Sequence, residues 1–133
     1  LFFEQGLTLI SQVDEGITVS GDEEALRRVL EILLDNAQKY SSPGGETQVA
    51  LHRRGRNHCA LTVANQGEPI PPEARRQIFQ RFYRADPARS RNGSFGLGLS
   101  IAEGIVAQHH GTIDVTCAGG FNRFRVELPC RQE

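Results

Sequence analysis

Segments with alternating apolar residues occur as neighbouring pairs along this chain, and segments with helical periodicity separate the pairs. The alternation predicts strands at residues 7–13, 17–20, 46–53, 58–65, 112–117 and 122–128. Helical spacing predicts helices over about 22–40, from 71 onward, and over about 97–109. Antiparallel neighbours interrupted by helices favour an α+β fold. We therefore expect a two-layer sandwich in which three main helices cover one face of a mixed, mostly antiparallel sheet.

Turn and cap residues set the expected ends of these helices. Asp22 can cap the first helix, and the Ser-Ser-Pro-Gly-Gly segment at 41–45 ends it. Pro71 begins the second helix, and Gly111 is a suitable C′ residue for the third. Residues 84–95 have no apolar periodicity and contain proline, asparagine and glycine, so we expect a long mobile loop there.

The length of 133 residues is enough for a substantial core, so we expect a single domain over residues 1–133. A net charge of −1 argues against a nucleic-acid partner held by bulk charge. No apolar run reaches the ~18 residues that would cross a membrane. Three cysteines without a C-x-x-C spacing favour reduced thiols in a cytoplasmic domain. The chain begins at Leu1 rather than methionine, and we expect it to be part of a larger protein.

Three glycines lie within residues 93–99, Gly-Ser-Phe-Gly-Leu-Gly-Leu, where an apolar helical pattern begins. Glycine permits a close approach of the backbone to another group, and the free N–H groups at the start of a helix favour phosphate. A tight loop before a helix is the alternative interpretation, and this run alone does not distinguish the two.

The first predicted helix carries an amide within its apolar face. Val29, Ile32 and Asn36 share that face at spacings of three and four. A buried amide without a partner costs about 1–3 kcal/mol, so either the fold or a ligand satisfies Asn36. Lys39 lies one turn later, and an amide oxygen beside an ammonium suits a magnesium-bound polyphosphate. The alternatives are an amide bonded to nearby backbone and a lysine on the solvated surface.

The strand at 58–65 ends in a second amide. Asn65 continues the face that Val63 occupies, so its side chain points inward at the end of the strand. An amide offers donors and an acceptor, which suits the edge of a purine. Gly67 leaves room for a flat ring, on which Ile70 could pack. The alternative is an Asn-Gln-Gly turn in which Asn65 tolerates left-handed geometry.

Four segments in order resemble the sequence boxes of the catalytic, ATP-binding domain of bacterial sensor histidine kinases. They are 33–41 (N box), 65–73 (G1 box), 78–84 (F box) and 93–99 (G2 box). The resemblance covers essentially the whole chain, and the wider superfamily (GHKL) includes gyrase, the Hsp90 chaperones and MutL. It implies the Bergerat ATPase fold and transfer of the γ-phosphoryl group of Mg-ATP to a histidine in two-component signalling.

The resemblance implies a role for each matching residue. Asn36 would hold Mg²⁺ on the ATP phosphates, while Lys39 would contact phosphate and Arg84 would reach the γ-phosphate during transfer. Tyr40 would line the pocket, and Asn65 would bond the adenine amino group. The remaining nucleotide contacts would come from Gly67, Ile70, Gly93, Gly96, Leu97, Gly98 and Leu99. Residues 84–95 would form the lid over the nucleotide.

Three positions depart from the family pattern. Most relatives have aspartate where this chain has Asn65; an amide oxygen still accepts from adenine, but without charge assistance. Asn65→Asp is therefore expected to preserve or tighten ATP binding. Phe95 stands where many relatives have Ser or Thr, and Ile32 stands where the ATP-hydrolysing relatives have a water-activating Glu. The alternative functions are a chaperone- or topoisomerase-type ATPase, which Ile32 disfavours, and a kinase-dead binding module.

None of the four histidines precedes an acidic residue, as the phosphoacceptor of the family typically does. The resemblance therefore implies that a phosphoacceptor helical hairpin belongs to the parent protein, which would also engage a response regulator. It implies a parent in the bacterial inner membrane, with this domain in the cytoplasm, without membrane contact of its own and monomeric in isolation. His109 and His110 fall at a helix C-terminus, where a surface cap is favoured over a metal pair.

Overall fold

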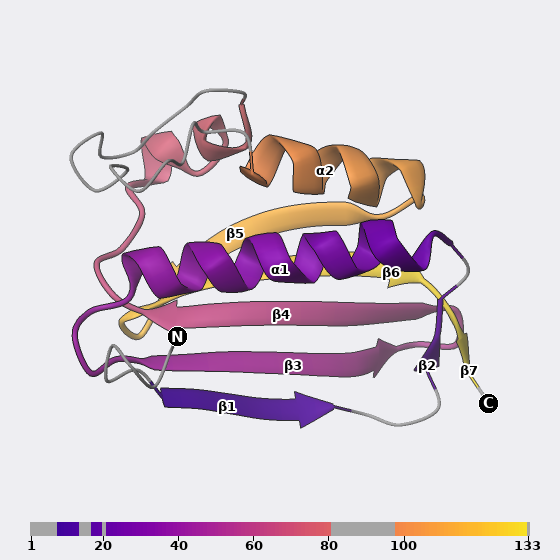
Figure 1. Ribbon diagram of the computed structural model, residues 1–133, viewed down its shortest axis with the longest axis horizontal. Helices are drawn as coiled ribbons and strands as arrows, with labels where there is room; N and C mark the ends of the chain where they lie inside the picture. Colours follow the sequence, from indigo (N-terminus) through magenta and orange to yellow (C-terminus); the bar gives the residue numbers. More distant parts are fainter. Residues whose placement is uncertain (1–7, 14–16, 20, 81–97, 133) are drawn as a thin grey trace.

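The computed structural model describes residues 8–13, 17–19, 21–80 and 98–132, and its helices lie on one face of a sheet (Figure 1). The strands are β1 (Thr8–Val13), β2 (Ile17–Thr18), β3 (Glu46–Arg54), β4 (His58–Gln66), β5 (Thr112–Ala118), β6 (Phe121–Pro129) and β7 (Arg131–Gln132). The helices are α1 (Glu23–Tyr40), α2 (Gly98–Gln108) and two short 3₁₀ helices, η1 (Pro72–Ala74) and η2 (Gln77–Phe79). The expected α+β two-layer fold is confirmed.

The main sheet has five strands in the order β1-β3-β4-β6-β5. β1 and β3 are parallel, and α1 supplies the crossover that parallel neighbours require. The other neighbours in this sheet are antiparallel, as predicted. A separate antiparallel pair joins β2 to β7, a two-residue strand that the sequence pattern did not predict. Among the described residues, no helix is both long and apolar enough to cross a bilayer.

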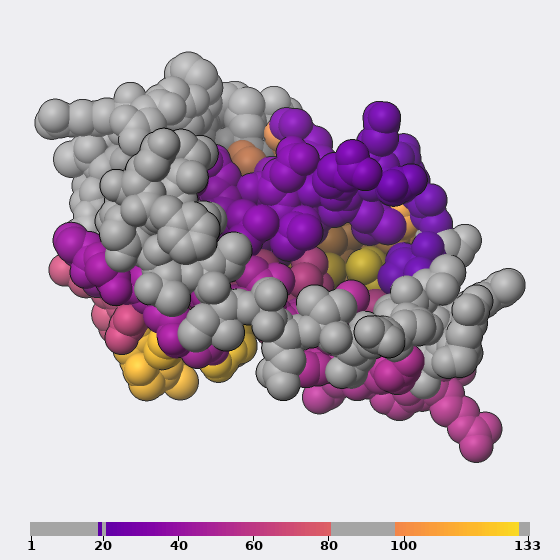
Figure 2. Space-filling model, turned by 60° about the horizontal axis from the view of Figure 1, so that its bottom comes forward, coloured from indigo at the N-terminus to yellow at the C-terminus, as the bar shows by residue number. Residues whose placement is uncertain are grey.

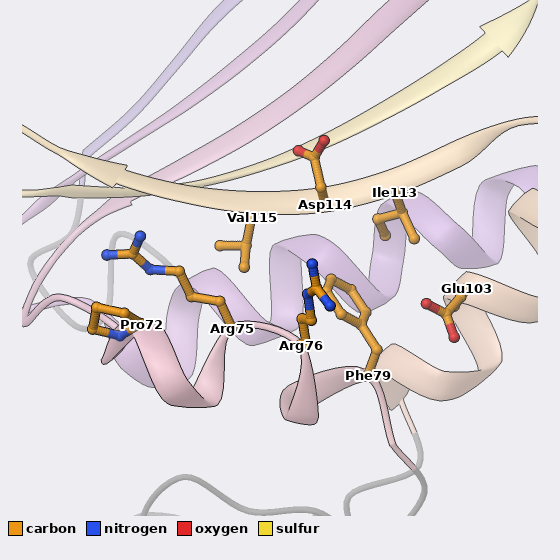
Figure 3. A pocket seen from close by; sticks show the side chains of 8 residues that line it. All are labelled: Pro72, Arg75, Arg76, Phe79, Glu103, Ile113, Asp114 and Val115. Carbon is orange, nitrogen blue, oxygen red and sulfur yellow. The ribbon is translucent and has the colours of Figure 1, made fainter.

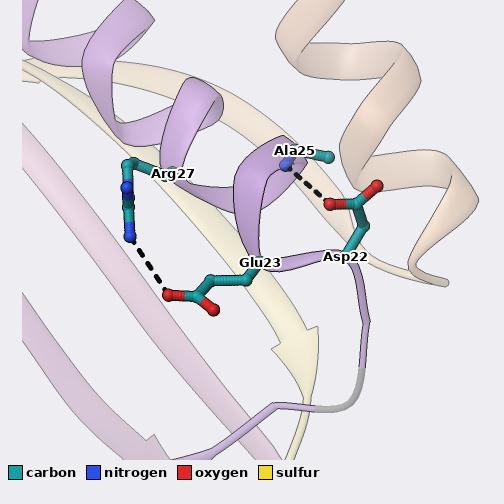
Figure 4. Close-up of polar contacts among 4 residues, drawn as sticks. All are labelled: Asp22, Glu23, Ala25 and Arg27. Carbon is teal, nitrogen blue, oxygen red and sulfur yellow. Dashed lines mark hydrogen bonds and ion pairs between the residues drawn. The ribbon is translucent and has the colours of Figure 1, made fainter.

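The first helix begins where Asp22 caps it (Figure 4). The Ala25 N–H donates to Asp22 Oδ1 at 3.1 Å, and Glu23 pairs with Arg27 at 3.1 Å on the exposed side. The acidic first turn also complements the positive end of the helix dipole. The opposite side of α1 buries Val29, Leu33 and Ala37 against the sheet. Figure 2 shows α1 as a continuous ridge of indigo and purple atoms with strand atoms visible beneath it.

The core lies between this helical layer and the central strands. β6 alternates buried and half-buried residues over its whole length, which is the pattern of a strand with one face on a core. Phe124 on β6 meets Phe79 of η2 edge-to-face, with ring centroids 6.2 Å apart. This aromatic pair fixes the segment after β4 to the sheet.

The second predicted helix is instead the pair of 3₁₀ helices η1 and η2. Pro71 O accepts from the Ala74 N–H at 2.9 Å, and Ile70 O accepts from Arg75 Nε at 3.2 Å. An α-helix starting here would need both carbonyls to accept from amides four residues later. The backbone bonds of this segment instead join residues three apart, although Ala74 and Ile78 are buried as their spacing predicts. Phe82, the next residue of that spacing, lies outside the described residues.

The end of α2 also differs from the prediction in one detail. The residue in the left-handed conformation after Gln108 is His110, with φ 61°, and not Gly111. The amides of His110 and Gly111 donate to carbonyls three and five residues earlier, at 3.0 and 2.9 Å, which is the Schellman pattern. A Cβ on Gly111 would meet Glu127 O and would lie 2.7 Å from Leu128 Cδ2. Gly111 therefore serves the close approach of β6.

Candidate functional site

A row of side chains with polar atoms crosses the helix-facing side of the sheet near the C-terminal end of α1. Thr47, Asn65, Asn122 and Cys117 are register neighbours across β3, β4, β6 and β5, and we call them the polar row. Thr47, Asn65 and Asn122 are at most 2% exposed. Buried polar groups cost free energy unless they are bonded. Asn65 and Asn122 have partners, whereas Thr47 Oγ1 has none among the described residues.

Asn65 is oriented by the last residue of α1. Its Nδ2 donates to Tyr40 O at 3.3 Å, and because a carbonyl oxygen only accepts, the amide nitrogen must be the atom that faces Tyr40. Asn65 Oδ1 is then left without a hydrogen-bond partner among the described residues. The side chain is inward at the end of β4, as expected, and the alternative of a left-handed turn residue is wrong.

Asn36 lies near this amide because of the helical repeat. Asn36 and Tyr40 are four residues apart, so they share one face of α1 and are separated by about 6 Å along its axis. Asn36 is half-buried, and its amide has no hydrogen-bond partner within the described part of the chain. The contact between Asn65 and Tyr40 therefore brings both predicted amides to the same end of α1.

The start of α2 faces the same side of α1. A Cβ added to Gly98 would lie 3.4 Å from Ile32 Cγ2, and Ile32 is one turn before Asn36. Leu99 packs against the core beside it. The first N–H groups of a helix have no partner within the helix and favour anions. The start of α2 can thus offer donors to a phosphate held near Asn36.

Lys39 is engaged in an ion pair on α1. Its Nζ lies 3.4 Å from Asp35 Oδ2, and the Lys39 side chain is 20% exposed. An i,i+4 pair with a largely exposed partner contributes little to stability. The ammonium can therefore exchange this partner for a phosphate at small cost.

The segment after β4 returns toward α1 at a point where only glycine fits. A Cβ on Gly67 would lie 2.5 Å from Tyr40 O and 3.2 Å from Asn65 Nδ2. The Gly67 N–H donates to Gly120 O at 3.1 Å, in the turn between β5 and β6. Gly67 therefore keeps the end of β4 close to α1, beside the amide of Asn65.

Asn122 belongs to the polar row, and the sequence reasoning missed it. Its Nδ2 donates to Glu68 O at 2.8 Å, and its Oδ1 accepts from the Ile70 N–H at 3.0 Å. The available signal was the alternation in the last long strand, since Asn122 occupies the same face as Phe124 and Val126. A polar residue at an inward strand position was the argument that identified Asn65, and it applies equally here.

Five residues discussed for the site lie outside the described residues: Arg84, Gly93, Phe95, Gly96 and Leu97. The predicted mobile loop at 84–95 lies there too. The roles that the resemblance implies for them stay predictions.

The described residues fit a nucleotide better than a metal held by protein alone. They contain no cluster of three or more His, Cys, Asp or Glu suited to a metal. Magnesium usually takes one or two protein ligands and completes its shell with phosphate and water. An unpartnered amide at Asn36 beside the start of α2 suits that arrangement, and the free Oδ1 of Asn65 suits a base.

A separate groove lies beside β5, the edge strand of the sheet (Figure 3). Its volume is about 610 Å³, and its lining residues are Pro72, Arg75, Arg76, Phe79, Glu103, Ile113, Asp114 and Val115. Arg75 and Arg76 come from the η1–η2 segment, while Glu103 comes from α2. No residue predicted to contact nucleotide lines this groove, so it is distinct from the site around Asn65.

Comparison with known proteins gives consistent matches. Residues 21–132 match the HATPase_c family, the histidine kinase-, DNA gyrase B-, and HSP90-like ATPases. The signal transduction histidine-protein kinase/phosphatase MprB of Mycolicibacterium smegmatis is 49% identical over 107 residues, which are 79% of this chain and 22% of that protein. A solved mycobacterial sensor histidine kinase MprB matches with a TM-score of 0.85 and 31% identity, over 99% of this chain and 88% of that one. Full-length ShkA in complex with AMPPNP matches with a TM-score of 0.84 and 26% identity, over 98% of this chain and 27% of that one.

Proposed function

Since this chain belongs to the HATPase_c family, we propose that it binds Mg-ATP and transfers the γ-phosphoryl group to a histidine outside these 133 residues. It would be the catalytic and ATP-binding domain of a sensor histidine kinase in two-component signalling, with residues 1–133 as one domain. The observation that carries the proposal is the bond from Asn65 to Tyr40 O, because it joins the amide assigned to adenine to the helix that carries Asn36.

The base would be recognised by Asn65 Oδ1, the acceptor atom of this side chain that the bond to Tyr40 O does not involve. With Nδ2 committed to Tyr40 O, the side chain presents Oδ1, which accepts a hydrogen bond from an exocyclic amino group. Adenine carries such a group at C6. Guanine carries a carbonyl there, so two acceptors, the guanine oxygen and Asn65 Oδ1, would face each other without a proton between them. Gly67 lets the end of β4 approach Tyr40 O closely enough for Asn65 to be held there, and Ile70 would supply an apolar surface for the ring.

The phosphates would be held by residues from α1 and α2. Asn36 Oδ1 would be the protein ligand of Mg²⁺, which when bound neutralises charge on the phosphoryl group. Backbone N–H groups near Gly98 and Leu99 would donate to phosphate oxygens, and Lys39 would exchange Asp35 for a phosphate. Arg84, Gly93, Gly96 and Leu97 are proposed to complete these contacts. The chemistry assigned to the protein is therefore positioning and charge neutralisation.

Ile32 favours transfer over hydrolysis. This apolar side chain lies against Gly98, one turn before Asn36, where the ATP-hydrolysing relatives have a base. A hydrocarbon side chain cannot take a proton from water. The position therefore supports a kinase domain rather than a chaperone- or topoisomerase-type ATPase.

The partners follow from the same proposal. The substrate histidine would lie on a phosphoacceptor helical hairpin of the parent protein, and a response regulator would be reached through that parent. The parent would reside in the bacterial inner membrane, with this domain on its cytoplasmic side. The isolated domain would be monomeric and would contact neither nucleic acid nor membrane.

Calorimetric titration with AMPPNP, with and without Mg²⁺, tests the nucleotide site. Asn36→Ala should lose the magnesium-dependent part of the affinity while keeping its fold, because the proposed protein ligand of the cation is gone. Gln38→Ala removes an amide about 200° away on the same helix and should bind like the wild type. Equal magnesium-dependent affinities for Asn36→Ala and wild type would refute the role of Asn36.

Phosphotransfer needs an experiment of its own. Mixing this domain with a purified helical hairpin from the parent and labelled ATP should yield acid-labile phosphohistidine on the hairpin. A domain that binds AMPPNP but yields no phosphohistidine would instead be a kinase-dead binding module.

A further inference from the structure

Asn122 joins two segments that are more than fifty residues apart in sequence. Both polar atoms of its carboxamide are hydrogen-bonded to the segment from Glu68 to Ile70: Nδ2 donates to Glu68 O at 2.8 Å, and Oδ1 accepts from the Ile70 N–H at 3.0 Å. The Asn122 side chain is only 2% exposed, so its carboxamide is shielded from water. The segment from Glu68 to Ile70 is therefore fixed to β6 by one side chain.

Two further hydrogen bonds help to hold the segment from Glu68 to Ile70 against β6. Arg75 Nε donates to Ile70 O at 3.2 Å, so both backbone polar groups of Ile70 are bonded to side chains. The Cys117 thiol lies 2.9 Å from Asn122 Oδ1 and 3.6 Å from Ile70 O; donation of its proton to the nearer oxygen, Asn122 Oδ1, helps to hold the carboxamide in the orientation that Ile70 requires. Asn122, Arg75 and Cys117 together form what we call the Ile70 clamp.

We propose that Asn122 is a positioning residue for nucleotide binding, acting through the Ile70 clamp. The inference rests on the proposed function, because it assigns Ile70 to the base side of the nucleotide pocket. Asn65 and Asn122 are register neighbours on β4 and β6, so the clamp is built beside the amide that reads the base. An apolar residue at 122 would remove the bonds that Asn122 makes with Glu68 O and the Ile70 N–H, and the segment would no longer be fixed to β6 through this side chain.

The clamp acts on the base side and not on the phosphates. The proposed phosphate donors belong to α1 and the start of α2, and none of them bonds to Asn122 in the described structure. Loss of the Ile70 clamp should therefore reduce the affinities for adenosine and for AMPPNP by the same factor. A general loss of structure would instead reduce the fraction of folded protein.

The test is titration of the 133-residue chain with AMPPNP and Mg²⁺, and with adenosine, for matched variants. Asn122→Leu has a similar size but makes neither bond, and we expect affinity for both ligands to fall at least tenfold. Val126→Ala removes a core side chain from the same face of β6 and should lose stability while binding within twofold of wild type. Cys117→Ser can still donate to Asn122 Oδ1, so it should bind more tightly than Cys117→Ala.

Each outcome decides the proposal. Binding by folded Asn122→Leu within twofold of wild type would overturn it, as would a loss confined to AMPPNP. If Asn122→Leu does not fold, the two Cys117 variants carry the test, and equal affinities for them would count against the clamp. Failure of the wild type to bind either ligand would instead overturn the proposed function, and this inference with it.

Discussion

At the scale of single residues, Asn65 has one polar atom that serves the fold and one that is free for a ligand. In Asn65→Asp, a carboxylate oxygen would face Tyr40 O where an amide nitrogen now donates at 3.3 Å. We expect the free energy of unfolding without nucleotide to fall by about 1 kcal/mol, because one hydrogen bond is lost and two acceptors face each other. The remaining oxygen would accept from adenine with charge assistance, so AMPPNP affinity should hold or tighten.

Thermal unfolding without nucleotide and calorimetry with AMPPNP separate these two effects of Asn65→Asp. Asn57→Asp adds the same charge at an exposed hairpin position and should change neither measurement. If Asn65→Asp lost more than tenfold in affinity, the base would have to meet a different atom of the site.

The same residues show how far sequence reasoning reaches. Asn36 and Asn65 could be singled out because each is an amide placed on an apolar face by a simple period, 3.6 for the helix and 2 for the strand. Asn122 obeys the same rule, but its partners Glu68 and Ile70 lie in a segment without periodicity. The contact between Asn65 and Tyr40 also could not be predicted from the sequence, because it depends on how α1 packs on β4.

At the scale of elements, the strands were predicted well because alternation is dictated by one buried face. Helix ends were harder, because they depend on hydrogen bonds made by neighbouring segments. The segment after Ile70 makes backbone bonds between residues three apart and forms two 3₁₀ helices in place of the second predicted α-helix. Likewise, the left-handed residue that ends α2 is His110, whereas the glycine at 111 is required by the close approach of β6.

The end of α2 allows two substitutions with opposite expected signs. His110→Gly should raise the free energy of unfolding by about 0.5–1 kcal/mol, since φ 61° strains a residue with a Cβ. Gly111→Ala should lower it by about 1–3 kcal/mol, because the new methyl group would overlap Glu127 O and crowd Leu128. Urea unfolding of both variants measures these changes. A stabilising Gly111→Ala would show that Gly111 is chosen for the helix end after all.

At the scale of the whole molecule, the two ends of α1 have different tasks. Its C-terminal end carries Asn36 and Tyr40 of the proposed nucleotide site, whereas its N-terminal end is tied to α2 by His109. The Asp22 N–H donates to His109 Nε2 at 3.1 Å, and since Nε2 accepts, the proton is on Nδ1, which donates to Ile105 O at 2.8 Å. Both ring nitrogens are thus bonded to backbone, which agrees with a capping role and not with a metal pair. This anchor lies at the end of α1 opposite to Asn36 and Tyr40.

A buried thiol in the core links the stability of the whole domain to alkaline pH. Cys59 is 1% exposed on β4, and burial raises its pKa from 9.0 to about 12, with smaller contributions from a hydrogen bond with Cys130 and the charges of Cys130 and Glu127. Between pH 9 and pH 12 the folded protein keeps this proton while the unfolded chain releases it. The unfolded state then binds fewer protons, so stability must fall as pH rises.

We expect the decline of the free energy of unfolding through Cys59 to begin about one pH unit below the unfolded-state pKa of 9.0 and to steepen to about 1.4 kcal/mol for each pH unit above it. Urea unfolding at several pH values between 8 and 11 measures the decline. Cys59→Ala has no thiol to titrate and should show a shallower decline than wild type. Val63→Ala cuts a side chain from the same face of β4, so it should be less stable at every pH with the wild-type slope. An equally steep decline in Cys59→Ala would mean that another group loses its proton only on unfolding.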